Sequence, residues 1–230
     1  MKNHLNSAFA AVALGLLAQA PAHSAVVFTF NDSLLSCPTL SVCAISTDGN
    51  LAEGSQGYAA IPGFDGQFAR GTAVTASLSG LPTHATVSID FLLAVIDSWD
   101  GLSGGFGPDI FEVKVDGVTV FSAGYDIFDA ADQSAVRGTQ LAYNTQLGFN
   151  QAYGDAAYDM ASVAALHGIA HSAPVMLVDF VFASSQGIDD ESFALDKLSI
   201  SVDSVSVPES SGIALLGMAL AGLGFARRRV

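Results

Sequence analysis

The feature that most constrains the fold is a series of short apolar runs with the two-residue period of β-strands. Residues Ile110–Phe121 read I-F-E-V-K-V-D-G-V-T-V-F, with alternating runs on both sides of an Asp-Gly pair. Asp-Gly in this setting predicts a two-residue hairpin turn, because both turn positions need a positive φ. Such runs, separated by Gly, Pro, Asp and Ser, predict an all-β fold, either a sandwich or a barrel. The other runs are Val26–Phe30, Thr72–Leu78, Ala85–Ile96, Val175–Ala183 and Phe193–Val202.

Two segments do not show this pattern. Asp48–Gly71 is rich in glycine and mostly polar, so we expect a loop there. Asp155–His167 contains good helix formers and has an aspartate at its start, which is compatible with a short helix. A strand remains the alternative for this second segment.

The N-terminus has the three parts of a secretory signal peptide. Lys2 and His4 supply a basic start, an apolar run extends from Ala8 to Ala18, and small residues surround Ala22. A basic start, an apolar core and an A-x-A-like cleavage site define such a signal. We therefore expect residues 1–25 to form a signal helix that is removed on export.

The C-terminal segment, residues 207–230, also has three parts. A polar hinge, V-P-E-S-S-G, precedes an apolar run from Ile213 to Phe225 and a basic cluster, Arg227-Arg228-Arg229. About 20 apolar residues are needed to cross a bilayer core, so this run predicts only a short transmembrane helix. The arginines are expected to stay on the cytoplasmic side. Such a tail suits transient retention in the inner membrane.

Val207-Pro208-Glu209, the Gly-, Leu- and Ala-rich run and the arginine cluster resemble the sorting tail of bacterial PEP-CTERM proteins. The sequence departs from the family motif at Ser210, where the motif has proline. The resemblance implies that an exosortase-like enzyme processes the tail and that the protein reaches the cell surface or extracellular space. A permanently membrane-tethered protein is the alternative.

The composition is strongly acidic. The chain has 8 Lys and Arg against 22 Asp and Glu, a net charge of −14. Lys2, the arginine cluster and Glu209 lie in the terminal segments, so residues 26–206 keep 4 basic and 21 acidic residues, or −17. This balance argues against nucleic acid and anionic membrane surfaces as partners, because both need a basic patch. The segment has a length that suits one domain.

Cys37 and Cys43 are the only cysteines. A close, even pair in an exported protein predicts a disulfide, whereas a metal pair would usually bring more ligands at shorter spacing. We therefore expect a structural disulfide that closes a small loop around Pro38.

Acidic residues gather in two regions that suggest a Ca²⁺ site. One is the Gly-rich loop between two predicted strands, and the other is the start of the last strand. Ca²⁺ takes 6–8 hard oxygen ligands from carboxylates and carbonyls. Acidic loops in so negative a chain are also common without a metal ion. The predicted site uses some of Asp97, Asp100, Asp109, Glu191 and Asp196.

The D-S-W-D loop at 97–100, the hairpin after it and the D-E-S-F-A-L-D-K-L segment at 190–198 resemble jelly-roll domains of exported PEP-CTERM proteins. Those domains are similar to carbohydrate-binding sandwiches in which Ca²⁺ often holds the loops. The resemblance implies a jelly-roll-like sandwich and association with exopolysaccharide. Trp99, the single tryptophan, is then a candidate for stacking on a sugar, with packing in the core as the alternative.

Catalytic patterns are weak. Ser103 lies in a formal G-x-S-x-G, but the strand–turn–helix context of a nucleophile elbow is missing. His167 and His171 have the i, i+4 spacing of a helical metal pair but lack the intervening glutamate of zinc hydrolases. We therefore expect an exported, non-enzymatic surface or matrix protein, with a secreted polysaccharide-acting hydrolase as the alternative.

Overall fold

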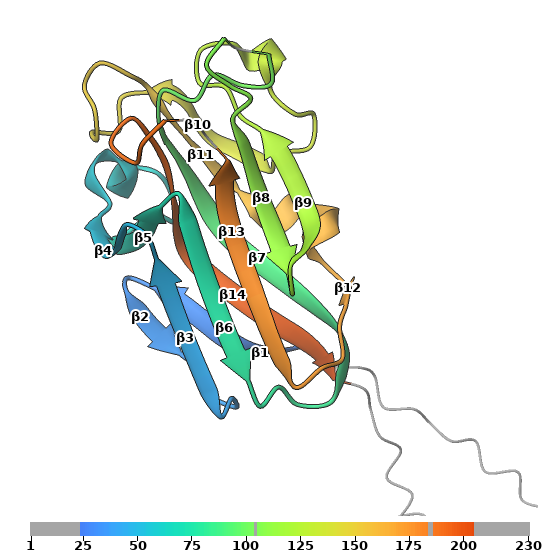
Figure 1. Ribbon diagram of the computed structural model, residues 1–230. Coiled ribbons are helices and arrows are strands. Elements are labelled where there is room, and N and C mark those ends of the chain that lie inside the picture. The colour runs from blue at the N-terminus through green and yellow to red at the C-terminus, as the bar shows by residue number, and fades with distance from the viewer. Residues whose placement is uncertain (1–23, 104, 184–185, 205–230) are drawn as a thin grey trace, which may run out of the picture. The chain divides into compact units, whose positions relative to one another are not determined.

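The computed structural model describes residues 24–103, 105–183 and 186–204. These residues form two antiparallel β-sheets that pack face to face, and their only helical segments are short 3₁₀ turns (Figure 1). The all-β prediction is therefore confirmed at this level. The sorting motif, the arginine cluster and both expected terminal helices lie outside the described residues, apart from Ser24 and Ala25. These two residues begin the first strand.

The first sheet contains nine strands, and its main path runs in the order β10-β11-β7-β14-β1-β2. β12 pairs with β7, and β5 pairs with both β14 and β4. The strands are β1 (Ser24–Asn31), β2 (Leu34–Ser36), β4 (Asn50–Gly54), β5 (Gln67–Gly71), β7 (His84–Asp97), β10 (Thr139–Thr145), β11 (Asp155–Asp159), β12 (Ile169–Ala170) and β14 (Glu191–Ser204).

The second sheet contains five strands in the order β3-β6-β13-β8-β9. The strands are β3 (Val42–Thr47), β6 (Ala73–Ser79), β8 (Ile110–Val115), β9 (Val118–Gly124) and β13 (Val175–Ala183). β8 and β9 form the predicted hairpin, and Asp116 and Gly117 both have the positive φ values (50° and 80°) that its turn requires.

The main core lies between the two sheets. In β6 every second residue is buried, so Val74, Ala76 and Leu78 face the other sheet. Phe91 of β7 meets Phe180 of β13 across the interface, with ring centroids 5.1 Å apart in an edge-to-face contact. Burial of apolar area at roughly 25 cal/mol per Å² makes this interface the main source of stability.

A second apolar cluster covers the opposite face of β7. Here the segment predicted as a polar loop, Asp48–Gly71, forms β4, a 3₁₀ turn η1 (Gln56–Ala60) and β5. Tyr58 is fully buried in this cluster, and the carbonyl oxygens of Val95 (2.9 Å) and Ala156 (3.0 Å) both lie within hydrogen-bond distance of its single O–H donor. The loop prediction was wrong because a few aromatic residues, spaced among glycines, are enough to fasten this segment to the sheet.

The ambiguous segment Asp155–His167 combines strand and turns. It begins as β11 and continues as two single 3₁₀ turns, η3 (Met160–Ser162) and η4 (Ala164–Leu166). The side chain of Asp159 caps η3 by accepting a hydrogen bond from the N–H of Ala161 at 2.9 Å.

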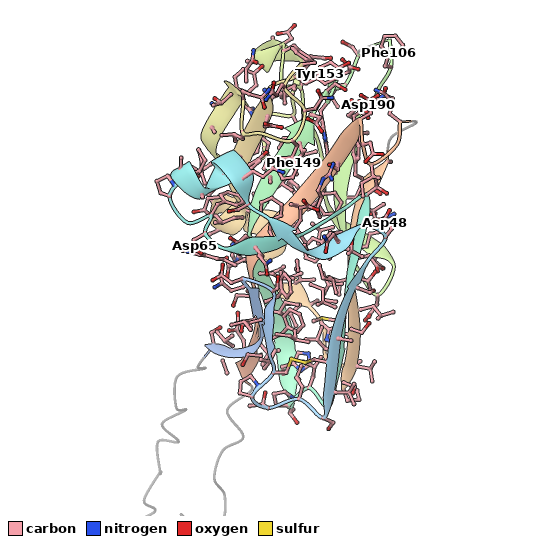
Figure 2. All side chains as sticks on the ribbon, turned by 90° about the vertical axis from the view of Figure 1, so that its left-hand side faces the viewer. Asp48, Asp65, Phe106, Phe149, Tyr153 and Asp190 are labelled. Atoms are coloured by element: carbon pink, nitrogen blue, oxygen red, sulfur yellow. A yellow bond between two sulfur atoms is a disulfide. The ribbon has the colours of Figure 1, made fainter. Side chains whose placement is uncertain are left out.

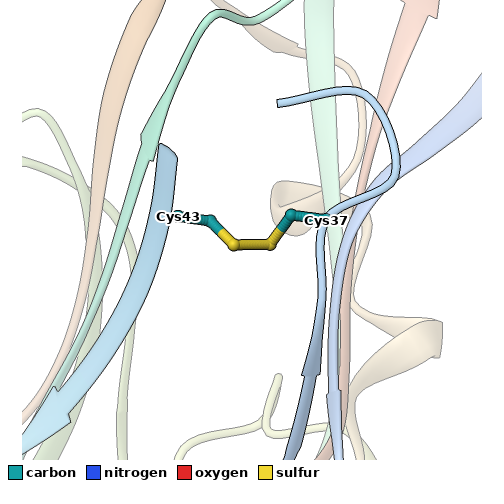
Figure 3. The surroundings of a disulfide bond; sticks show 2 residues. All are labelled: Cys37 and Cys43. Carbon is teal, nitrogen blue, oxygen red and sulfur yellow. A yellow bond between two sulfur atoms is a disulfide. The ribbon is translucent and has the colours of Figure 1, made fainter. Parts of the chain in front are cut away.

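The predicted disulfide between Cys37 and Cys43 is present (Figure 3). It connects the chain just after β2, in the first sheet, to β3, in the second. The bond therefore joins the two sheets at one edge of the sandwich.

Candidate metal centre and ligand pocket

The functional candidates gather where four loops meet at one end of the sandwich. These loops follow β7, β9, β10 and β13. Figure 2 shows Phe106, Tyr153 and Asp190, from three of them, near this end. The loop after β9 contains the remaining 3₁₀ turn, η2 (Ala130–Asp132).

Trp99 belongs to the loop after β7, and its side chain points into the core. Its side chain is fully buried, with its ring stacked on Phe182 at 3.7 Å between centroids and edge-on to Tyr125 at 5.9 Å. Its indole N–H donates to the carbonyl oxygen of Ser192 at 3.0 Å. A ring that is covered on all sides has no face open to a sugar, so Trp99 has the packing role and not the stacking role.

Three predicted cation ligands converge at this end of the sandwich. Asp100 follows β7, Asp109 precedes β8, and Glu191 is the first residue of β14. One carboxylate oxygen from each lies within 4.8 Å of the other two. Asp109 and Glu191 are fully buried, whereas Asp100 is partly exposed. We call these three residues the carboxylate triad.

The local backbone fixes Asp109. Its N–H donates to the carbonyl oxygen of Gly101 at 2.8 Å, and its Oδ2 accepts a hydrogen bond from the N–H of Asp100. The φ of Gly101 is +77°, and a Cβ there would lie 2.8 Å from the carboxylate of Asp126, so glycine is needed at this bend.

The electrostatics of Asp109 favour a cation. Burial raises the pKa of Asp109 to about 6, and the nearby charge of Asp100 also raises it. Contacts of the Asp109 carboxylate with the Asp100 N–H and the Glu191 carboxyl lower this pKa. Its Oδ1 is buried and receives no hydrogen bond from an N–H or hydroxyl group. Among the described residues, no ion pair involves Asp100 or Asp109. A buried carboxylate in this position is costly unless it is protonated or bound to a cation.

The structure separates Asp97 from the triad. Its Cα is the register partner of Glu191, but its side chain lies beside Asp155, whose carboxylate accepts the Asp97 N–H at 3.0 Å. Burial, followed by the charge of Asp155, raises the pKa of Asp97 to about 7.

Asp196 belongs to a different acidic group, with Asp32 and Asp65. It lies next to an irregularity in the pairing of β14 with β7, where its carboxylate accepts the N–H groups of Lys197 (2.7 Å) and Asp65 (3.4 Å). Burial raises its pKa to about 6. Three of the five predicted ligands therefore come together, and two lie elsewhere.

A cavity of about 260 Å³ opens beside the triad. It is lined by Ser98, Asp100, Phe106, Phe128, Tyr153, Gln186 and Asp190, and we call it the loop pocket. Phe106 and Phe128 are 72% and 52% exposed, although large apolar side chains are usually covered. No sequence pattern indicates Phe106, Phe128 and Tyr153 as a group, because they lie on three separate loops and no spacing connects them.

The contacts of Ser103, His167 and His171 do not form a catalytic or metal-binding arrangement. Ser103 is exposed, and its N–H donates to Asp132 at 2.8 Å. His167 contacts the carbonyl oxygen of Ala161 at 3.0 Å, whereas His171 contacts Asp116 at 3.1 Å and His84 at 2.7 Å. The two histidines thus turn to different partners and do not form a metal pair.

The fold and these loops define an acidic, disulfide-bonded, antiparallel β-sandwich with a candidate cation site at one end. No protein-family model matches the chain, and no curated protein is significantly similar to it. Within the described residues, no helix has the length and apolar character to cross a membrane.

Proposed function

We propose that this protein is an exported, non-enzymatic component of the bacterial cell surface or extracellular matrix, and that Ca²⁺ bound by the carboxylate triad stabilises its sandwich. The observation that carries this proposal is the buried Oδ1 of Asp109, which lies in the triad without a hydrogen bond from an N–H or hydroxyl group. A divalent cation between Asp109 and the neighbouring carboxylates would supply a partner of opposite charge.

The chemistry of the triad favours Ca²⁺. All its side-chain donors are carboxylate oxygens, which hard cations prefer, and no sulfur or imidazole from the described part of the chain joins the group. Ca²⁺ tolerates irregular shells of 6–8 oxygens, so nearby backbone carbonyls and water can complete its coordination. Asp100, Asp109 and Glu191 come from three separate chain segments, so the ion would hold the loops together.

Export and sorting are supported by the two terminal segments and by the disulfide. Disulfides form and persist mainly in oxidising compartments outside the cytosol. The C-terminal motif supports processing by an exosortase-like enzyme after transient retention in the inner membrane. The two antiparallel sheets are compatible with the jelly-roll-like architecture that the resemblance implies, and the same resemblance supports association with exopolysaccharide.

A polysaccharide hydrolase is the second candidate, because a carboxyl group with a pKa of about 6 beside other carboxylates suits general acid catalysis. The burial of the triad argues against this function. Asp109 and Glu191 are both fully buried, so neither carboxyl group can contact a glycosidic oxygen without rearrangement of the loops.

Two measurements on protein secreted by a bacterial host would test the proposal. We expect the intact mass of the secreted protein to lack both terminal segments, and elemental analysis after dialysis in dilute Ca²⁺ to give one calcium per chain. Recovery of the untrimmed chain from the cytosol would contradict export. Absence of bound calcium would contradict the metal site. If the protein cleaves a polysaccharide and the Asp109→Asn substitution abolishes that cleavage, the hydrolase function would be favoured.

A further inference from the structure

The loop pocket lies beside the carboxylate triad but is not the same site. Only Asp100 belongs to both, while the buried Asp109 and Glu191 do not line the pocket. The function of the pocket therefore needs its own explanation.

Aromatic rings form one part of the wall. Phe106 comes from the loop after β7, Phe128 from the loop after β9 and Tyr153 from the loop after β10. The rings of Phe128 and Tyr153 meet at 74°, with centroids 6.5 Å apart, so they form a corner. Figure 2 shows Phe106 and Tyr153 at the same end of the molecule.

Carboxylates form the other part of the wall of the loop pocket. Asp100 and Asp190 both line the pocket, and the hydroxyl of Ser98 donates to Asp190 at 3.4 Å. Two aspartate side chains in so small a lining give the pocket a negative local potential. Among the residues that the structure describes, no Lys, Arg or His lines the pocket.

We propose that the loop pocket binds a ligand with a protonated amine or quaternary ammonium group, between the rings of Phe106, Phe128 and Tyr153 and the carboxylates of Asp100 and Asp190. Aromatic faces attract such cations through their quadrupoles, and rings arranged around a cation add their contributions. The two carboxylates supply the opposite charge.

The charge of the pocket discriminates among ligand classes. In the metal-free protein, an anionic ligand would meet Asp100 and Asp190 with no basic side chain among the described lining residues to offset them. A neutral sugar could stack on the rings and donate hydroxyl hydrogens, but it would leave the negative potential uncompensated. A ligand cation uses both the rings and the charge. The carboxylate of Asp100 keeps its full negative charge when no metal ion is bound at the triad, so ammonium binding is tested in the presence of a chelator.

Choline and its uncharged carbon isostere, 3,3-dimethyl-1-butanol, make a matched pair of probes. Each is titrated in EDTA into protein with isotope-labelled Phe and Tyr, and the ring signals are followed by NMR. We expect saturable shifts at Phe128 and Tyr153 with choline, and at least about tenfold weaker binding of the isostere. Glucosamine and N-acetylglucosamine form a second matched pair. The first carries a protonated amine on a sugar, and the second carries the same amine in an uncharged, acetylated form.

Substitutions locate the site. We expect Phe128→Ala and Asp190→Asn each to weaken choline binding by about three- to tenfold. Asp189→Asn removes the same charge one residue away, outside the lining, and should bind as the unchanged protein does. Melting curves confirm that each variant is folded.

Equal binding of the two isosteres, stronger binding of N-acetylglucosamine than glucosamine, or no saturable shift with either amine would overturn the proposal. Because every titration contains EDTA, these results are independent of calcium binding.

Discussion

The indole N–H of Trp99 donates a 3.0 Å hydrogen bond to the carbonyl oxygen of Ser192. Trp99 precedes Asp100, and Ser192 follows Glu191, so this bond joins the two segments that supply two of the three proposed Ca²⁺ ligands. The stacking of Trp99 on Phe182 fixes the same junction to the second sheet. The core of the sandwich and the carboxylate triad are therefore connected through one side chain.

Replacement of Trp99 by Phe should weaken both stability and Ca²⁺ binding. The variant leaves a small cavity and removes the donor to Ser192, which together should lower the free energy of unfolding by about 1–3 kcal/mol. Urea denaturation measures the stability, and calorimetric titration measures the Ca²⁺ affinity. Phe180→Leu, a core change on β13, is the control and should lower stability with little effect on affinity. Unchanged Ca²⁺ affinity in Trp99→Phe would show that this bond does not position the triad.

Asp97→Asn should change how stability depends on pH. The pKa of Asp97 is raised from 3.8 to about 7 in the folded protein, so folding is accompanied by proton uptake. The contribution of this residue to the free energy of unfolding therefore falls as pH rises from about 4 to about 7. The asparagine variant lacks that decline and should gain stability relative to the unchanged protein across this range.

Urea denaturation at several pH values in EDTA measures the effect of Asp97→Asn. Asn tolerates the left-handed backbone at this position, where φ is 69°, so the substitution introduces little strain. Asp189→Asn, at an exposed site, controls for the loss of one negative charge. Parallel pH curves for the Asp97 variant and the unchanged protein would contradict the role of its burial.

Loss of the disulfide should destabilise the sandwich by about 2 kcal/mol, because the bond closes a short loop and limits the unfolded chain. Six positions separate Cys37 and Cys43 in the sequence. Urea denaturation of the double variant Cys37→Ser/Cys43→Ser, compared with the unchanged protein with and without reductant, measures the effect. Reductant should leave the double variant unaffected. Equal stability of the oxidised protein and the double variant would show that β2 and β3 are held together without the bond.

Much of the fold could be predicted from local sequence patterns. Alternation marked β6, β8 and β13, and Asp116-Gly117 marked the hairpin turn, because strand period and turn chemistry are properties of neighbouring residues. The strands of Asp48–Gly71 were missed, since their apolar contacts depend on Tyr58 reaching a sheet that is distant in sequence.

The candidate metal site could be predicted only in part, because local sequence patterns do not contain the contacts between distant segments. Acidic residues beside glycines pointed to Asp100, Asp109 and Glu191, but sequence could not tell which carboxylates converge. The side chains of Asp97 and Asp196 turn away at points where the backbone is irregular, with φ of 69° at Asp97 and 49° at Lys197. The aromatic rings of the loop pocket meet only in three dimensions.

The central claim is that the carboxylate triad binds Ca²⁺, and thermal melting in Ca²⁺ and in EDTA tests it most directly. We expect Ca²⁺ to raise the melting temperature of the unchanged protein and of Asp189→Asn by the same amount, through selective binding to the folded state. Asp109→Asn should lose this response while it remains folded in EDTA. Equal melting temperatures in Ca²⁺ and EDTA for the unchanged protein, or a full Ca²⁺ response in Asp109→Asn, would contradict the claim.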